Sequence, residues 1–131
     1  MFKSLLLTAC LLAVGMARAG EIAVIVNPAA PEFTREQIAD IYLGRDRGQQ
    51  PLDQPEPAAL RTEFYQRLAG RDLAQMKALW SRIVFTGRGQ PPREQADSAA
   101  VKRAVAANPR AIGYIEKSAV DPSVKVALIL N

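Results

Sequence analysis

The chain has 131 residues, of which 49% are apolar and 23% are charged, and its formal net charge is +4. This composition excludes a disordered or a fibrous protein. The sequence holds one cysteine and no histidine. It therefore excludes an internal disulfide, a nucleophile activated by histidine, and a zinc or haem site with histidine ligands.

The first 19 residues have the three parts of a secretory signal peptide. Lys3 gives a positive start, residues 5–16 form an apolar run, and residues 17–19 read Ala-Arg-Ala, a small-x-small cleavage site. The run is shorter than the ~20 residues that a membrane-spanning helix needs. We predict a signal peptide at 1–19, a mature domain at 20–131, a periplasmic location and no stable membrane insertion.

Removal of the signal peptide changes what the net charge implies. The mature chain would have 112 residues and would lose Lys3, Cys10 and Arg18, so its net charge falls from +4 to +2. No run of Lys and Arg is longer than two residues, and nucleic acid is therefore not an expected partner. A chain of this size buries about two-thirds of its unfolded surface, enough for one core.

The first part of the mature chain predicts a strand and then a helix. Residues 21–26 are apolar and β-branched, which is typical of a buried strand. Thr34 and Gln37 have the spacing of a capping box, and Gly44 ends the helix that follows.

The middle of the chain predicts two more helices after an irregular segment. Residues 45–57 are rich in proline and charge, with a short strand possible at Leu52. Pro57 suits the first turn of a helix that Gly70 ends, and Asp72 caps the next helix. The apolar stripe predicted to be buried on that helix consists of Leu73, Met76, Leu79, Trp80 and Ile83.

The last part of the chain predicts a loop, a helix and two strands. The loop covers residues 85–92, Asp97 or Ser98 caps the helix, and residues 111–115 and 124–130 form the strands. The order predicts an α/β fold with one small mixed sheet packed with helices. The aromatic residues that we interpret as core rather than as a stacking platform are Trp80, Phe85 and Tyr114.

Helix N-termini are the best physical candidates for a ligand site, because their free N–H groups and positive dipole favour anions. Three such starts are Thr34, the segment 56–61 and Ser98. Arg61 lies in the first turn of its helix, where a guanidinium can bind phosphate or sulfate through two hydrogen bonds. The alternative is a surface arginine that pairs with Glu56 or Glu63, and spacing alone favours this alternative.

Enzyme chemistry has little support in the sequence. The acidic residues are scattered, and no phosphate loop or dinucleotide motif is present. Ser–Lys pairs exist at 117–118 and 123–125, and neither is promising. Residues 117 and 118 are neighbours, and neighbouring residues of a strand point to opposite faces. We therefore expect no catalytic residue, no metal site and no cofactor.

Four segments resemble phosphate ABC-transporter substrate-binding proteins, including short members with a single lobe. Residues 33–44 resemble a helix of that family, and residues 60–65 resemble the start of its next helix. Residues 80–87 with 91–92 are similar to a signature of the short members, and Ala111-Ile112-Gly113-Tyr114-Ile115 matches a strand of the full-length proteins. The matches keep their order over residues 22–129.

This resemblance implies one lobe of a type II periplasmic-binding-protein fold. It also implies phosphate or a related oxyanion held by N–H groups, hydroxyls and an arginine. Residues 56–59 read Glu-Pro-Ala-Ala where relatives have a Gly-Ser pair, so a hydroxyl and an N–H donor are missing. The binding residues that we predict are Arg61, Ala58, Ala59, Thr34 and Ser98.

Two functions follow as expectations. The first is a periplasmic phosphate- or oxyanion-binding protein that binds weakly as a monomer, because one open lobe leaves the anion partly in water. A homodimer would supply the missing face. The alternative is an envelope protein-interaction module that has kept the lobe fold without the ligand.

Overall fold

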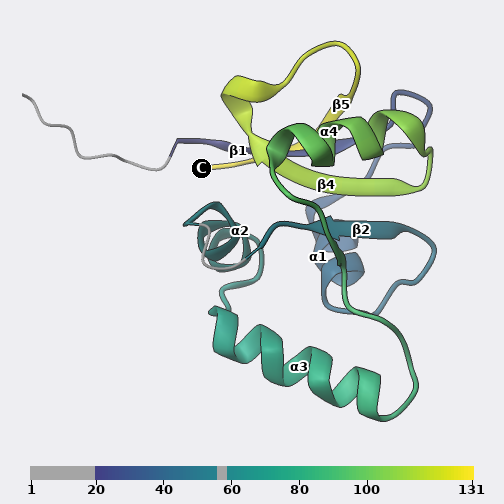
Figure 1. Ribbon diagram of the computed structural model, residues 1–131, viewed down its shortest axis with the longest axis vertical. Helices are drawn as coiled ribbons and strands as arrows, with labels where there is room; N and C mark the ends of the chain where they lie inside the picture. The colour runs from purple at the N-terminus through teal and green to yellow at the C-terminus, as the bar shows by residue number, and fades with distance from the viewer. Residues whose placement is uncertain (1–19, 56–58) are drawn as a thin grey trace, which may run out of the picture.

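A computed structural model describes residues 20–55 and 59–131, so the predicted signal peptide lies outside the described residues. Within them the chain forms five strands, four α-helices and one short 3-10 helix (Figure 1). In chain order they are β1 (Ile22–Val26), α1 (Arg35–Tyr42), β2 (Gln50–Asp53), α2 (Ala59–Ala69), α3 (Leu73–Phe85), β3 (Arg93–Glu94), α4 (Ser98–Ala107), β4 (Ala111–Glu116), η1 (Lys117–Ala119) and β5 (Lys125–Leu130).

The strands form one mixed sheet in the order β3-β2-β4-β1-β5. β1 is antiparallel to both β4 and β5, whereas β2 is parallel to both β3 and β4. The predicted α/β fold with one small mixed sheet is therefore confirmed. β3 is a two-residue strand that the sequence did not indicate, because two residues are too few for a hydrophobic period to be visible.

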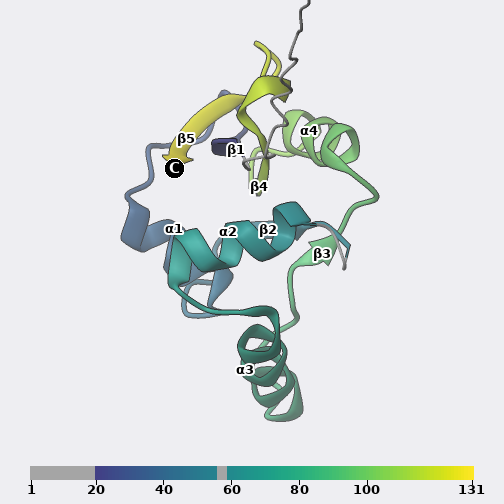
Figure 2. The ribbon, with the colours of Figure 1, turned by 90° about the vertical axis from the view of Figure 1, so that its left-hand side faces the viewer.

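Alternation along the central strands gives the sheet two apolar faces. In β1, Val24 contributes to one core and Ile25 to the other; in β4, Tyr114 and Ile115 divide in the same way. α1 and α2 cover the first face, and α4 covers the second through Val101 and its neighbours (Figure 2). The domain is thus a three-layer arrangement with the sheet in the middle.

Local signals in the sequence place the helix ends correctly. Thr34 and Asp72 form complete capping boxes with the residues three positions on. Gly44 and Gly70 have positive φ angles just after α1 and α2, where only glycine is unstrained. Asp97 is the cap of α4, so Ser98 is the first residue of the helix rather than its cap.

The prediction of a fully buried stripe on α3 is wrong. Met76 alone of the five stripe residues is buried, and the other four are only half-buried. Phe85, interpreted as a core residue, is 92% exposed, whereas Tyr114 is in the core as expected. α3 lies at one end of the molecule, away from the sheet (Figures 1 and 2). Helical periodicity identifies an apolar stripe but does not tell how much of it other elements cover.

None of the helices in the described residues is long and apolar enough to cross a membrane.

The contact between β4 and α4 makes Gly113 a sensitive position. A Cβ atom there would collide with Cγ1 of Val101. We expect Gly113→Ala to lower the free energy of unfolding by ~1–3 kcal/mol, measured by urea denaturation, because a packed core resists an added carbon.

The companion variant Val101→Ala should recover part of that loss in the double mutant, since it removes the colliding methyl group. Gly89→Ala is the matched control, because its nearest side-chain atom would be at an ordinary 3.6 Å. An equal loss in both single glycine variants would contradict the packing explanation.

Candidate functional site

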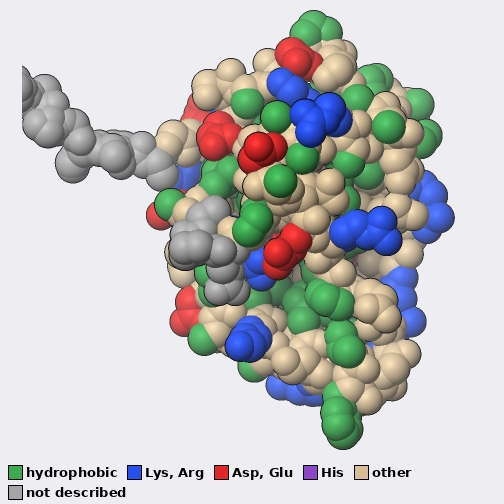
Figure 3. Space-filling model, viewed as in Figure 1, with side chains coloured by type: hydrophobic (Ala, Val, Ile, Leu, Met, Phe, Trp, Pro, Cys, Tyr) green, Lys and Arg blue, Asp and Glu red, His purple; other side chains and the backbone are tan. Residues whose placement is uncertain are grey.

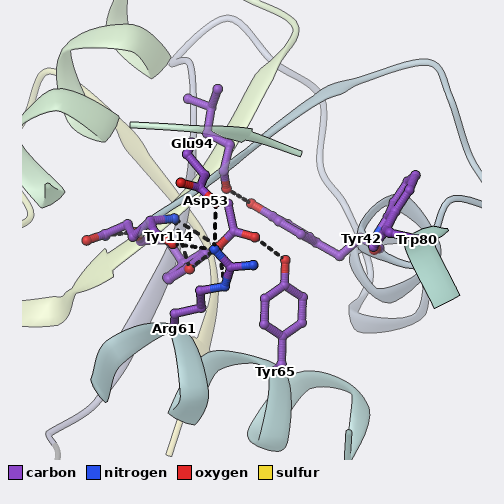
Figure 4. A network of polar contacts seen from close by, with 9 residues as sticks. Tyr42, Asp53, Arg61, Tyr65, Trp80, Glu94 and Tyr114 are labelled. Carbon is purple, nitrogen blue, oxygen red and sulfur yellow. Dashed lines mark hydrogen bonds and ion pairs between the residues drawn. The ribbon is translucent and has the colours of Figure 1, made fainter. Parts of the chain in front are cut away.

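The candidate site lies where β2 ends. Asp53 and Gln54 are only 3% and 5% exposed, although both are polar. A buried carboxylate is costly unless several donors satisfy it. The side chains of α2, β4 and β3 converge on this point (Figure 4).

Two tyrosines satisfy the Asp53 carboxylate. Tyr65 of α2 donates its hydroxyl to Oδ2 at 2.6 Å, and Tyr114 of β4 donates to Oδ1 through a short hydrogen bond. The backbone N–H of Gln54 also donates to Oδ1, at 2.8 Å. Burial, and then the negative charge of Asp53, raise the pKa of both tyrosines above the ordinary value.

Arg61, the predicted anion ligand, is held by acceptors of this chain. Its Nη1 donates to the backbone oxygen of Gln54 at 2.9 Å and to Oε2 of Glu94 at 3.0 Å. Its Nε lies 3.9 Å from Oδ1 of Asp53. Burial acts to lower the pKa of the guanidinium, but Asp53 and Glu94 outweigh it, so the pKa is raised.

The local charge at Arg61 is therefore already compensated. One guanidinium faces two carboxylates, and its side chain is only 16% exposed. The sequence left open a pairing with Glu56 or Glu63. Glu56 lies outside the described residues, and Glu63 pairs with Arg67 one turn along α2 at 3.1 Å.

Gln54 joins Ser98 to the same network. Its Nε2 donates to Ser98 Oγ at 3.0 Å and to the Tyr114 backbone oxygen at 2.9 Å, and Ser98 Oγ donates to Glu116 at 2.6 Å. Gln54 thus contacts Arg61 through its backbone oxygen and Ser98 through its side chain. Ala59 begins the described part of α2, and Ala58 lies outside the described residues.

Thr34 occupies a different part of the fold. Its hydroxyl accepts the N–H of Gln37 at 3.1 Å, which is the capping role. The neighbouring Arg35 donates to the backbone oxygen of Arg67. Arg67 is six residues beyond Arg61, which is about 9 Å along the axis of α2. The start of α1 therefore contacts α2 at a point away from Arg61. We infer that Thr34 serves to begin α1.

A groove of about 550 Å³ opens beside this network, and we call it the Arg61 groove. Its volume is within the range of small-molecule sites. Its lining includes polar residues of the network and several residues of α3. The lining residues that matter here are Asp53, Arg61, Tyr65, Glu94, Trp80 and Phe85.

Sequence reasoning missed Asp53, Gln54 and Glu94. The available signal was the position of Asp53 and Gln54 directly after the strand expected at Leu52, because ligands often bind at the carboxyl ends of parallel strands. Glu94 gave no signal, since β3 itself was not visible in the sequence.

Both lysines of the Ser–Lys pairs contact other groups of the chain. Lys117 pairs with Glu21 at 3.0 Å, and Lys125 Nζ donates to the backbone oxygen of Ala30. Ser123 donates to Asp121. In the described part of the chain, no group of three or more Cys, Asp or Glu residues is placed to hold a metal ion.

No protein-family model and no curated protein sequence matches the chain. Solved structures with a similar fold include the following two. One is an ABC-type phosphate transport receptor from Vibrio cholerae, with a TM-score of 0.61, 22% identity, and coverage of 82% of this chain. The other is a putative phosphate ABC transporter substrate-binding protein with bound phosphate from Clostridium perfringens, with a TM-score of 0.64, 22% identity, and coverage of 84%.

The chain spans 46% of the length of each of these proteins. At this level of identity the likeness is one of fold. The shared part is an α/β lobe, as the resemblance of the sequence segments implied.

The three tyrosines give a direct test of the buried network. The chain has only Tyr42, Tyr65 and Tyr114, all three are buried, and burial followed by the charge of Asp53 raises the pKa of each. The folded protein therefore keeps protons that the unfolded chain releases above about pH 10. The free energy of unfolding should fall as the pH rises through that range.

Tyrosinate absorbance should therefore appear only as the protein unfolds. Circular dichroism, recorded in the same pH titration, measures the unfolding. Tyr65→Phe should lower stability at neutral pH by ~1–3 kcal/mol, because it removes a donor from a buried carboxylate. The free energy of unfolding of this variant should also fall less at alkaline pH than that of the wild type. Ionisation near pH 10 with the fold intact would refute the arrangement.

Proposed function

We propose that this chain binds a phosphate-type oxyanion weakly, in the periplasm, at the Arg61 groove. The observation that carries the proposal is Arg61 at the start of α2, which lines a groove of ligand size. Ser98 contacts the side chain of Gln54, whose backbone oxygen accepts from Arg61, and Ala59 belongs to the same first turn as Arg61. The Clostridium perfringens protein with this fold is described with bound phosphate, which supports an oxyanion as the ligand class.

The charges around Arg61 explain why binding should be weak. An incoming anion meets Asp53 and Glu94, and it must replace Glu94 on Nη1. The dipole of a helix N-terminus adds only ~0.3–1 kcal/mol at an exposed site. We therefore expect a dissociation constant of about 1 mM or weaker, which corresponds to roughly −4 kcal/mol.

Substitution of Glu94 should strengthen binding, which distinguishes this site from a surface arginine. Glu94→Gln keeps the size and removes the charge, and we expect about tenfold tighter phosphate binding, since hydrogen bonds to charged groups contribute roughly 1.5–3 kcal/mol. Arg61→Ala should abolish the rise in melting temperature that phosphate produces. Isothermal calorimetry and thermal shift measure the two effects.

The control is Arg103→Ala, because Arg103 is an exposed arginine on α4 outside the groove. Chloride at matched ionic strength separates binding from general salt effects. A submicromolar affinity of the monomer would overturn the expectation of weak binding. A phosphate effect that survives Arg61→Ala would remove Arg61 from the site.

A second candidate function is a protein-interaction module of the cell envelope. The compensated charge at Arg61 favours this function. Glu94 of the same chain already pairs with Arg61, so a bound anion is not required to balance its charge. The partner would be an envelope protein or a second copy of the chain.

Capture experiments decide between the two functions. If the chain is an interaction module, wild type and Arg61→Ala should retain the same partner from envelope extracts, with and without phosphate. Capture that depends on phosphate and on Arg61 would instead support ligand binding. Recovery of nothing by either protein would count against the module.

A further inference from the structure

The C-terminal half of α3 carries an exposed apolar end beside a cluster of arginines. Phe85 is 92% exposed and Val84 is 44% exposed, although both are large apolar residues. Figure 3 shows hydrophobic side chains protruding at the end of the molecule where α3 ends. Monomeric proteins seldom expose large contiguous apolar patches, and exposed patches rimmed by polar residues mark interaction sites.

Arg82 lies one turn before Phe85 on α3, and it belongs to a strongly basic region next to the apolar end. A hollow of about 540 Å³ has Arg45, Arg47, Arg82 and Arg88 in its lining, together with Leu79 and Ile83. None of its described lining residues is acidic, although Arg45 pairs at 3.4 Å with Asp40 just outside it. All four arginines are exposed.

The basic charge is concentrated in this part of the chain. Residues 71–93 contain five Lys or Arg residues and one Asp, a net charge of +4. The whole chain also has a net charge of +4, so the remaining residues sum to zero. A partner that covers the arginines of this region therefore meets an excess of positive charge, although Asp53 and Glu94 line the groove next to Phe85. This excess favours a negatively charged partner.

We propose that this surface docks an acidic protein segment that carries an apolar anchor. We define the α3 docking surface as Val84 and Phe85 together with Arg45, Arg47, Arg82 and Arg88. The apolar anchor of the partner packs on Phe85 and Val84, and its Asp or Glu residues pair with the arginines. Arginine suits this role, since its planar guanidinium binds carboxylates through two hydrogen bonds.

The proposal rests on the interaction-module function and names its surface and the chemistry of its partner. A second copy of this chain fits less well, because the same basic surface would repel itself in a symmetric dimer. An anionic membrane is a separate outcome of the test below.

Photo-crosslinking in the cells that produce the protein tests the proposal. The full chain carries Phe85→p-benzoylphenylalanine, which keeps an aromatic ring in place, and mass spectrometry maps the attached residue. We expect adducts with an acidic segment of one protein. The adducts should be lost in the Arg82→Ser/Arg88→Ser double variant and kept in Arg103→Ser. Added salt should reduce them, since exposed ion pairs are screened.

Every other outcome overturns the proposal. Adducts between two copies assign the surface to a homodimer, and adducts with lipid assign it to a membrane. Adducts that persist without the two arginines would mean that charge does not select the partner.

A second protein with the crosslinker at Val126, which is half-exposed on β5, separates failure of the α3 docking surface from failure of the interaction-module function. Adducts from 126 alone would keep an interaction module but reject α3, and adducts from neither would reject both.

Discussion

The buried carboxylate of Asp53 holds together the end of the domain at which the candidate site lies. β2 and β4 are paired through only two residue pairs, and Pro51 in one of them has no N–H to donate. The hydroxyls of Tyr65 and Tyr114 supply further ties from α2 and β4 to the same carboxylate. Because a buried charge without donors is very costly, these contacts fix the position of β2 against both elements.

Arg61 takes its place in the fold as a consequence. The negative charge of Asp53 and the backbone oxygen of Gln54 draw the guanidinium to the end of β2, and Glu94 of β3 covers it. The arginine thus stabilises a buried carboxylate before it contacts any ligand. An anion at Arg61 would have to compete with Asp53, Gln54 and Glu94, which is the physical reason for proposing a low affinity.

Local interactions could be predicted from the sequence, and long-range ones could not. The capping boxes at Thr34 and Asp72 depend on residues three positions apart, and the structure confirms both. The hydrogen bond between Asp53 and Tyr114 joins residues 61 positions apart, and no sequence period reports it. Arg61 was recognised from its place in a helix turn, but the identity of its partners depended on where β3 returns to the sheet.

The burial of α3 was also predicted wrongly because it depends on contacts between residues that are distant in the sequence. An apolar stripe is a property of the helix, whereas its burial is a property of what packs on it. The fold is one lobe, and the chain spans 46% of the length of the solved proteins that share it. Within the described residues, α1 and α2 reach Met76 and one side of Trp80, and Phe85 is left in water.

The two candidate surfaces of the protein are not independent. Arg61 and Phe85 both line the Arg61 groove. A partner seated on Phe85 would exclude water from that groove and strengthen the interaction of every charge in it. An acidic partner adds negative charge next to Glu94 and Asp53, so it works against an anion at Arg61. By linkage the opposition is reciprocal: an oxyanion in the groove weakens the partner by the factor by which the partner weakens the oxyanion.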